Sequence, residues 1–259
     1  MRAYHIDSFT DALFSGNPAA VCILDNEWPD EKLMAKIAME NNLSETAFII
    51  MKDGVRFIRW FTPKCEVNLC GHATLAAAHV LFNHEGVQDN EIMFESRKGA
   101  LGVKKQGSYI KLDFPSDSAR KITFFDELDC FNAKPLECYM GTDDYMLVFE
   151  SEDVIANLEC DFVKAAKLSD KEGLICTAKG RSVDFVSRYF GPKIEIYEDP
   201  VTGSAHTVMA PYWAKILGKT LMEAEQLSKR GGKLFCEIIG ERVIIGGQAV
   251  TYSINELLL

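Results

Sequence analysis

Two short segments of the sequence place small and polar residues where a helix would begin. Gly71-His72-Ala73 opens one stretch of small apolar residues, and Gly203-Ser204-Ala205 opens another in the second half of the chain. The first turn of a helix leaves backbone N–H groups unpaired, and together with the helix dipole these groups attract an anion. Two such helix starts, one in each half, predict a duplicated fold that binds one small acidic substrate.

Glu45 is the first candidate for acid/base chemistry. It lies where a helix-to-strand connection enters an otherwise apolar strand, which continues through residues 47–50. A carboxylate at the mouth of such a strand is partly removed from water, and carboxyl groups in that environment serve as general acids or bases. An ordinary surface glutamate or an ion pair is the alternative, and position alone favours that alternative.

His72 and Cys70 flank Gly71 at the first expected helix start. The positive end of the helix dipole disfavours an imidazolium there, so we expect a neutral His72 that donates one hydrogen bond and accepts another. A satisfied structural histidine is the alternative. The same dipole could lower the pKa of the Cys70 thiol and make it a base or nucleophile, but a lone thiol beside apolar Leu69 is more often inert.

Asp199 is the third candidate. Pro200 biases the preceding residue toward an extended backbone, so the Asp199 carboxylate projects past the turn. Ser204 and the N–H groups after Gly203 would then offer donors to a substrate carboxylate. A plain turn followed by a serine N-cap explains the segment almost equally well.

Cysteine usage bears on metals and on cellular location. The eight cysteines are an even count, but residues 1–7 alternate like a strand and lack the apolar region of a signal peptide. We therefore expect free thiols in a reducing cytoplasm. Cys65 and Cys70, with His72 and His79 nearby, lack the paired spacing of a zinc site, so the spacing predicts no metal.

Composition narrows the class of protein. The chain has 259 residues, of which 47% are hydrophobic and 25% charged, as in globular proteins with an apolar core. The net charge is −10 and there is no basic run, which argues against nucleic-acid and anionic-membrane partners. His79 interrupts even the most apolar stretch, so we expect no membrane-spanning helix.

Periodicity predicts the elements that position these candidates. In the first part we expect strands at 2–8, 18–24, 45–51, 55–61, 91–95, 99–105 and 108–114, a helix from about 29 to 41, and a helix over 73–82 that is apolar on nearly every side and therefore buried. In the second part we expect short strands and a helix within 119–178, strands at 183–187, 193–197, 234–239 and 242–246, and an apolar helix over 204–217.

The pattern breaks around residues 114–118, which we take as the domain boundary. The prediction is an α+β fold of two pseudo-symmetric domains, 1–115 and 116–246, each a curved, mostly antiparallel sheet around one central buried helix. A last strand over about 247–259 would return to the first domain, and the active site would lie in the cleft between the two.

Over essentially its full length the chain resembles the phenazine-biosynthesis PhzF-like isomerases, relatives of the diaminopimelate epimerase and proline racemase fold. The motifs that carry the resemblance are Phe14-x-Gly16-Asn17-Pro18-Ala19-Ala20-Val21, Leu43-Ser44-Glu45-Thr46-Ala47-Phe48, the segment 60–74, Glu198-Asp199-Pro200-x-Thr202-Gly203-Ser204-Ala205, and Ser228-x-Arg230-Gly231-Gly232. Several ordered motifs of this length are a specific signal, whereas each one singly would not be.

The resemblance implies an isomerase that needs no metal, flavin or pyridoxal cofactor. Glu45 matches the family's acid/base, which takes a proton from one carbon of a small unsaturated acid and returns it to another. His72 and Asp199 match residues that hold and polarise the substrate. The matched motifs also place substrate-binding residues at Asn17, Gly71, Ala73, Gly203 and Ser204. A cytoplasmic homodimer is the expected state.

Two other functions stay open. The related racemases use a thiol from each half; here Cys70 occupies the first thiol position, but Thr202 stands at the second. A threonine hydroxyl is a poor base, which disfavours two-base racemisation, although Glu45 paired with Cys70 could still epimerise a substrate. A non-catalytic small-acid-binding protein that kept the fold is the other alternative. The resemblance identifies neither the substrate nor the pathway.

Overall fold

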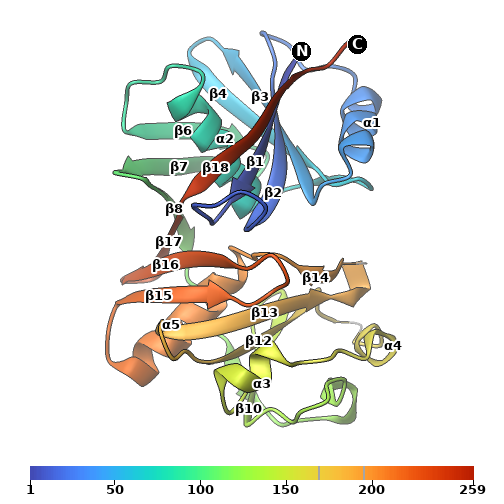
Figure 1. Ribbon diagram of the computed structural model, residues 1–259, viewed down its shortest axis with the longest axis vertical. Helices are drawn as coiled ribbons and strands as arrows, with labels where there is room; N and C mark the ends of the chain where they lie inside the picture. The colour runs from blue at the N-terminus through green and yellow to red at the C-terminus, as the bar shows by residue number, and fades with distance from the viewer. Residues whose placement is uncertain (169, 195) are drawn as a thin grey trace. The chain divides into compact units, whose positions relative to one another are not determined.

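The computed structural model describes residues 1–168, 170–194 and 196–259, which form two compact units (Figure 1). Unit 1 contains Met1–Asp113 together with Gly246–Leu259, and unit 2 contains Phe114–Ile245. The chain therefore leaves unit 1 near the end of one strand and returns to it with its last one. The sequence had suggested a boundary after residue 115 and a return near residue 247.

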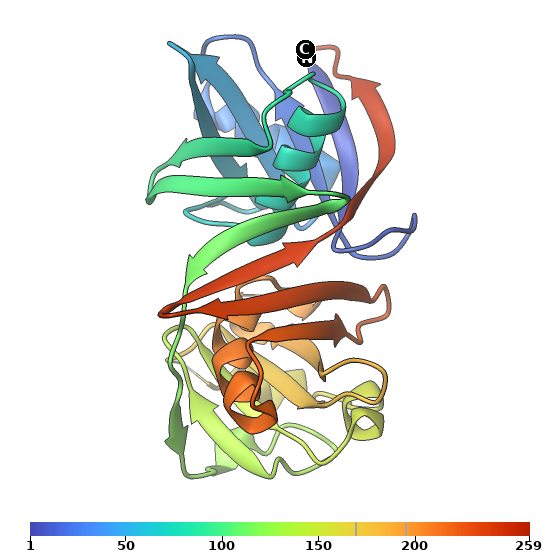
Figure 2. The same cartoon turned by 90° about the vertical axis from the view of Figure 1, so that its left-hand side faces the viewer.

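Unit 1 is a sheet folded around one helix. Its elements are β1 (Arg2–Ser8), β2 (Asn17–Ile23), α1 (Glu31–Asn41), β3 (Glu45–Lys52), β4 (Val55–Phe61), β5 (Glu66–Val67), α2 (Gly71–Asn83), β6 (Glu91–Ser96), β7 (Gly99–Gln106), β8 (Tyr109–Pro115), which runs to the boundary, and β18 (Ala249–Glu256). β1 pairs antiparallel with β2 and, on its other side, with β18, which runs beside it in Figure 2. The neighbours β2 and β3 are parallel, as are β4 and β6.

Helix α2 lies at the centre of unit 1, as its sequence predicts. It contacts β1, β2, β3 and β18, and its alanines, together with Leu75 and Val80, are fully enclosed. Small side chains on every face let four strands approach the helix closely. The helix start is consequently also inside the unit: the Ser8 hydroxyl donates to the His72 carbonyl at 2.9 Å, and the Thr74 hydroxyl donates to the Cys70 carbonyl at 2.6 Å.

Unit 2 has a related list of elements. They are β9 (Arg120–Ile122), η1 (Asp126–Leu128), β10 (Glu137–Met140), β11 (Asp144–Val148), α3 (Glu152–Ala156), α4 (Phe162–Ala165), β12 (Gly173–Lys179), β13 (Phe185–Gly191), η2 (Pro192–Ile194), β14 (Ile196–Asp199), α5 (Ala205–Leu217), β15 (Leu221–Gln226), β16 (Gly232–Ile239) and β17 (Arg242–Gly247). The predicted strand at 193–197 is wrong in its first part, where a short 3₁₀ helix begins at Pro192; residue 195 lies outside the described residues.

The two units repeat one pattern of strand pairing. β11 is parallel to β12 and β13 is parallel to β15, matching β2 with β3 and β4 with β6. The short strands β5 and β14 each pair antiparallel with the preceding long strand and lead into the central helices α2 and α5. The expected duplicated α+β fold with mostly antiparallel strands is confirmed. Among the described residues, no helix combines the length and apolarity needed to cross a bilayer.

A repeated arginine–glutamate pair fixes the corresponding positions of the two units. Arg59 on β4 forms two hydrogen bonds to Glu66 on β5, at 2.7 and 2.6 Å, and its guanidinium lies 5.2 Å from the centre of the Phe61 ring. Arg188 on β13 donates to Glu198 on β14 at 2.6 Å and lies 4.9 Å from the Phe190 ring. Each pair ties a long strand to the short strand that leads into a central helix.

We predict that Arg188→Met destabilises the protein by about 2–4 kcal/mol, because Glu198 is left without its partner in a mostly buried setting. Urea unfolding measures the change. Lys104→Met is the control, since the Lys104–Glu91 pair is exposed and its loss should leave stability unchanged. Replacing both Arg188 and Glu198 by apolar residues should recover part of the loss. Equal stability of Arg188→Met and the wild type would contradict this assignment.

Candidate active site

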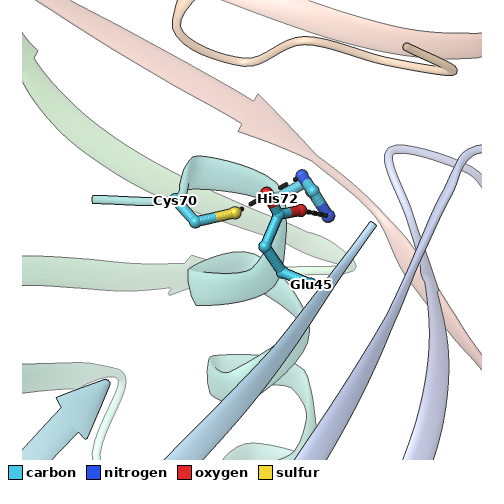
Figure 3. A group of neighbouring side chains, drawn as sticks. All are labelled: Glu45, Cys70 and His72. Carbon is cyan, nitrogen blue, oxygen red and sulfur yellow. Dashed lines mark hydrogen bonds and ion pairs between the residues drawn. The ribbon is translucent and has the colours of Figure 1, made fainter. Parts of the chain in front are cut away.

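Three polar side chains converge inside unit 1, at the start of α2 (Figure 3). Glu45 is the first residue of β3, Cys70 is the N-cap of α2, and His72 lies in the first turn of that helix. Glu45 Oε2 is 3.1 Å from His72 Nε2, and Cys70 Sγ is 3.5 Å from His72 Nδ1. The imidazole therefore lies between a carboxylate and a thiol.

The fold explains why these residues meet. Parallel pairing of β2 with β3 sets Glu45 level with Ala19, at the end of the sheet where the buried run of β3 begins. The start of α2 enters at the same level, because the Ser8 hydroxyl at the end of β1 binds the His72 carbonyl. Side-chain exposure is 13% for Glu45 and 8% for His72, so both groups are largely shielded from water.

Asn17 and Ser44 complete the surroundings of the imidazole. The Asn17 side-chain amide lies 3.3 Å from His72 Nδ1, and on its other side it meets the Ser44 hydroxyl at 3.1 Å. Asn17 is fully buried, which holds the ring plane and leaves Nε2 directed at Glu45. The two atoms of that contact, Glu45 Oε2 and His72 Nε2, are buried yet make no aligned hydrogen bond within the described part of the chain.

Electrostatics at this cluster correct the expectation of a neutral His72. Burial by itself lowers the pKa of His72, but the Cys70 sulfur and the Glu45 carboxylate outweigh it, and the pKa lies well above the ordinary value. Burial and then the Glu45 charge raise the pKa of the Cys70 thiol. The Glu45 carboxylate therefore favours the charged form of His72, whereas burial favours the neutral thiol of Cys70.

The remaining unit 1 candidates lie next to this cluster in the chain. Gly71 begins α2, and Ala73 is fully buried with its backbone N–H directed at the Cys70 sulfur. Sequence reasoning missed Ser8 and Ser44, whose hydroxyl contacts position the site. A buried serine at the end of an apolar strand was the available signal for Ser8; nothing in the local pattern around residue 44 pointed to Asn17.

The predicted residues of the second half form a separate group in unit 2. Asp199 ends β14 and is buried, and the Thr202 hydroxyl donates to its Oδ2 at 2.5 Å. Gln226, which sequence reasoning missed, accepts from the Thr202 N–H at 2.9 Å and donates to the Asp199 carbonyl at 2.8 Å. Its signal was an amide at the end of a strand whose inward residues are otherwise apolar.

Gly203 and Ser204 lead into α5. Ser204 is the N-cap residue of α5, as the plain interpretation expects, but its exposed side chain makes no capping hydrogen bond. The helix start is held instead by His206, whose Nδ1 donates to the Thr202 carbonyl at 2.9 Å. Burial lowers the pKa of His206 to about 4, which keeps it neutral. The Ser204 hydroxyl is exposed to solvent.

Corresponding positions show that the Glu45 carboxylate has no counterpart at the matching place in unit 2. Glu45 pairs with Ala19 in the parallel contact of β3 and β2, and the matching contact of β12 and β11 pairs Gly173 with Asp144. A Cβ at Gly173 would lie 2.3 Å from the Tyr189 hydroxyl, which donates to Asp144 at 2.9 Å. A tyrosine therefore fills, in unit 2, the space that a carboxylate side chain occupies in unit 1.

Glu45, Cys70 and His72 also form a donor set that could hold a metal ion. A carboxylate oxygen, the thiol sulfur and an imidazole nitrogen all lie within 4.8 Å of one another. Sequence spacing did not reveal this set, because Glu45 comes from a different element than the other two residues.

The chain is similar to known proteins in both sequence and fold. The profile of the phenazine biosynthesis-like (PhzC-PhzF) family matches residues 6–254. A Pseudomonas aeruginosa protein named as an uncharacterized isomerase is 46% identical, with 100% of this chain and 99% of the relative aligned. A human phenazine biosynthesis-like domain-containing protein is 39% identical, with 94% of each chain aligned.

Solved structures are similar to this chain as well. A PhzF-family phenazine biosynthesis protein of Enterococcus faecalis superposes with a TM-score of 0.97 at 45% identity, covering 100% of this chain and 99% of that one. A hydroxyproline epimerase of Agrobacterium vitis superposes with a TM-score of 0.64 at 10% identity, covering 98% and 91% of the two chains. The second likeness shows the shared fold alone.

We predict that Glu45→Gln lowers the pKa of His72, because burial then acts on the imidazole without the opposing carboxylate. NMR titration of the histidine ring resonances measures this. His79 is the internal control: burial and the neighbouring His84 lower its pKa to about 4, and Glu45 is not among the groups that act on it. An unchanged His72 titration in Glu45→Gln would show that the carboxylate does not hold the imidazolium.

Proposed function

The chain belongs to the phenazine biosynthesis-like (PhzC-PhzF) family, and from this membership and its own site we propose that it is a cofactor-independent isomerase. The proposed reaction moves a proton, and with it a double bond, in a small carboxylic acid. The observation that carries the proposal is the shielded contact between Glu45 and His72, with 3.1 Å between carboxylate oxygen and ring nitrogen. Its close curated relatives are named isomerases.

In this proposal Glu45 is the group that moves the proton. As a carboxylate it accepts a proton from one carbon of the substrate, and as a carboxylic acid it returns that proton to another carbon on the same face. His72 remains an imidazolium during the transfer. When Glu45 is protonated, the positive ring is no longer balanced by the carboxylate and lies beside the negative charge that develops on the substrate. Exclusion of water would keep the proton from exchanging during this step.

The polar groups of unit 2 are proposed to bind the substrate's own polar groups. The exposed Ser204 hydroxyl and the N–H groups that follow Gly203 offer hydrogen-bond donors of the kind that a carboxylate accepts. Asp199 is held in place by Thr202 and Gln226 and would accept from an amino or hydroxyl group. A small acid that carries such a second polar group is therefore the proposed substrate class.

An epimerase that uses Cys70 is the second candidate, favoured by the 3.5 Å contact between its sulfur and His72. The raised pKa of the buried Cys70 thiol weighs against it, because a thiolate is the reactive form. Thr202 at the corresponding position of unit 2 supplies no second thiol.

We predict that Glu45→Gln lowers turnover at least about a thousandfold while leaving the fold intact, because the amide cannot accept the proton. A thermal-shift screen of small carboxylic acids identifies ligands, and NMR then follows deuterium uptake from D₂O into each one. Glu40→Gln, on the exposed face of α1, is the matched control. Near-normal turnover in Glu45→Gln would overturn the proposal. Tight ligand binding without any exchange by the wild type would instead favour a binding protein.

Cys70→Ser separates the two reactions. We expect the isomerase to keep most of its turnover, because the thiol is neutral and serves only as a neighbour of His72. Chiral chromatography of the products, alongside the rate, measures the outcome. Inversion of a stereocentre by the wild type that disappears in Cys70→Ser would replace the isomerase with the epimerase. Cys65→Ser, which changes an exposed thiol, is the control.

A further inference from the structure

We propose that the Glu45–Cys70–His72 cluster binds a divalent ion of the zinc type, and that the ion inhibits the enzyme by occupying its acid/base. Binding itself follows from the geometry of the three side chains. The inhibition rests on the proposed function. The bound ion would not take part in catalysis, because the side chains that would ligate it are the ones that the proposed reaction uses.

The donor set matches zinc. Thiolate, imidazole and carboxylate are its usual ligands, and three protein ligands with one open position is a common arrangement. Bonds of about 2.3 Å to sulfur and about 2.0–2.2 Å to nitrogen and oxygen place tetrahedral ligand atoms roughly 3.5 Å apart. The three donor atoms already lie within 4.8 Å of one another, so side-chain adjustments of about 1 Å close the site. Magnesium and calcium, which prefer oxygen ligands, fit poorly.

An independent observation points to a ligand here. Glu45 Oε2 and His72 Nε2 are buried and lack an aligned hydrogen bond among the described residues, although they lie 3.1 Å apart. Asn17 meets the other ring nitrogen, Nδ1, at 3.3 Å. Ser44 fixes that amide from its other side, because its hydroxyl donates to Asn17 Oδ1 at 3.1 Å, so the imidazole that would ligate the ion is held by an outer pair of residues.

Charge and protons balance in the bound state. The Cys70 thiol loses its proton to solvent, and so does His72 where its ring is charged, while Glu45 binds as a carboxylate. One thiolate, one carboxylate and a neutral imidazole then compensate the two positive charges of the ion. A buried site that ends neutral avoids the cost of an uncompensated charge. Unit 2 has Gly173 and Thr202 at the positions of Glu45 and Cys70, so it lacks this donor set.

Cobalt(II) is the probe, because its bond to a thiolate gives a charge-transfer absorption band that reports binding without any measurement of activity. The full-length protein, kept reduced with a phosphine, is titrated with cobalt(II) and then with zinc(II). We expect a band that saturates at one ion per chain and is abolished by stoichiometric zinc. We further expect Cys70→Ser to remove the band and Glu45→Gln to weaken binding at least about tenfold.

Matched variants decide the location of the ion. Cys65→Ser should keep the full band, since that thiol is exposed and outside the cluster. Absence of a band in the wild type, or a band that survives in Cys70→Ser, overturns the proposed site. Inhibition is tested separately: zinc should stop turnover, and a chelator should restore it. Cobalt binding with zinc-insensitive turnover would leave the metal site standing and overturn the acid/base role of Glu45.

Discussion

The burial of the first turn of α2 is the constraint on which unit 1 depends. A helix without a polar face has to be enclosed on all sides, and enclosing it carries its N-terminus, with that end's unpaired backbone groups and first polar side chains, into the interior. Buried polar groups need partners. Ser8, Asn17 and Glu45 supply them from the ends of three strands, and the candidate site is the result.

Much of the fold is predictable from local patterns, whereas the site is only partly so. The buried helices and most strands follow from periodicity, because each pattern lies within one element. The prediction of a strand over 193–197 is wrong at its start. Its alternating residues resemble a strand, but Pro192, which has no N–H to donate, precedes them and begins a short 3₁₀ helix. The prediction of a neutral His72 is wrong for a different reason. The local dipole argument omits Glu45, which reaches the ring only through the parallel pairing of β2 and β3.

The corresponding positions of the two units carry side chains of different chemistry. Where unit 1 has Glu45, unit 2 has Gly173, whose space is taken by Tyr189. Where unit 1 has Cys70, unit 2 has Thr202, whose hydroxyl holds Asp199 and not a histidine. The Glu45 carboxylate has no counterpart at the matching position of unit 2, whose helix start presents the exposed Ser204 hydroxyl. One duplicated scaffold thus presents a carboxylate in one copy and a hydroxyl in the other.

The paired arginine and glutamate, Arg59 with Glu66 and Arg188 with Glu198, recur with a phenylalanine neighbour in both halves, although the residues four positions after each glutamate differ. Each pair connects a long strand to the segment that leads into a helix start, and the connection does not involve the side chains that the helix start presents. Substitutions at the helix start therefore leave the arginine–glutamate pair intact. A protein with such connections can change its chemistry through a few substitutions at one helix start, without any change in the strands that position those residues.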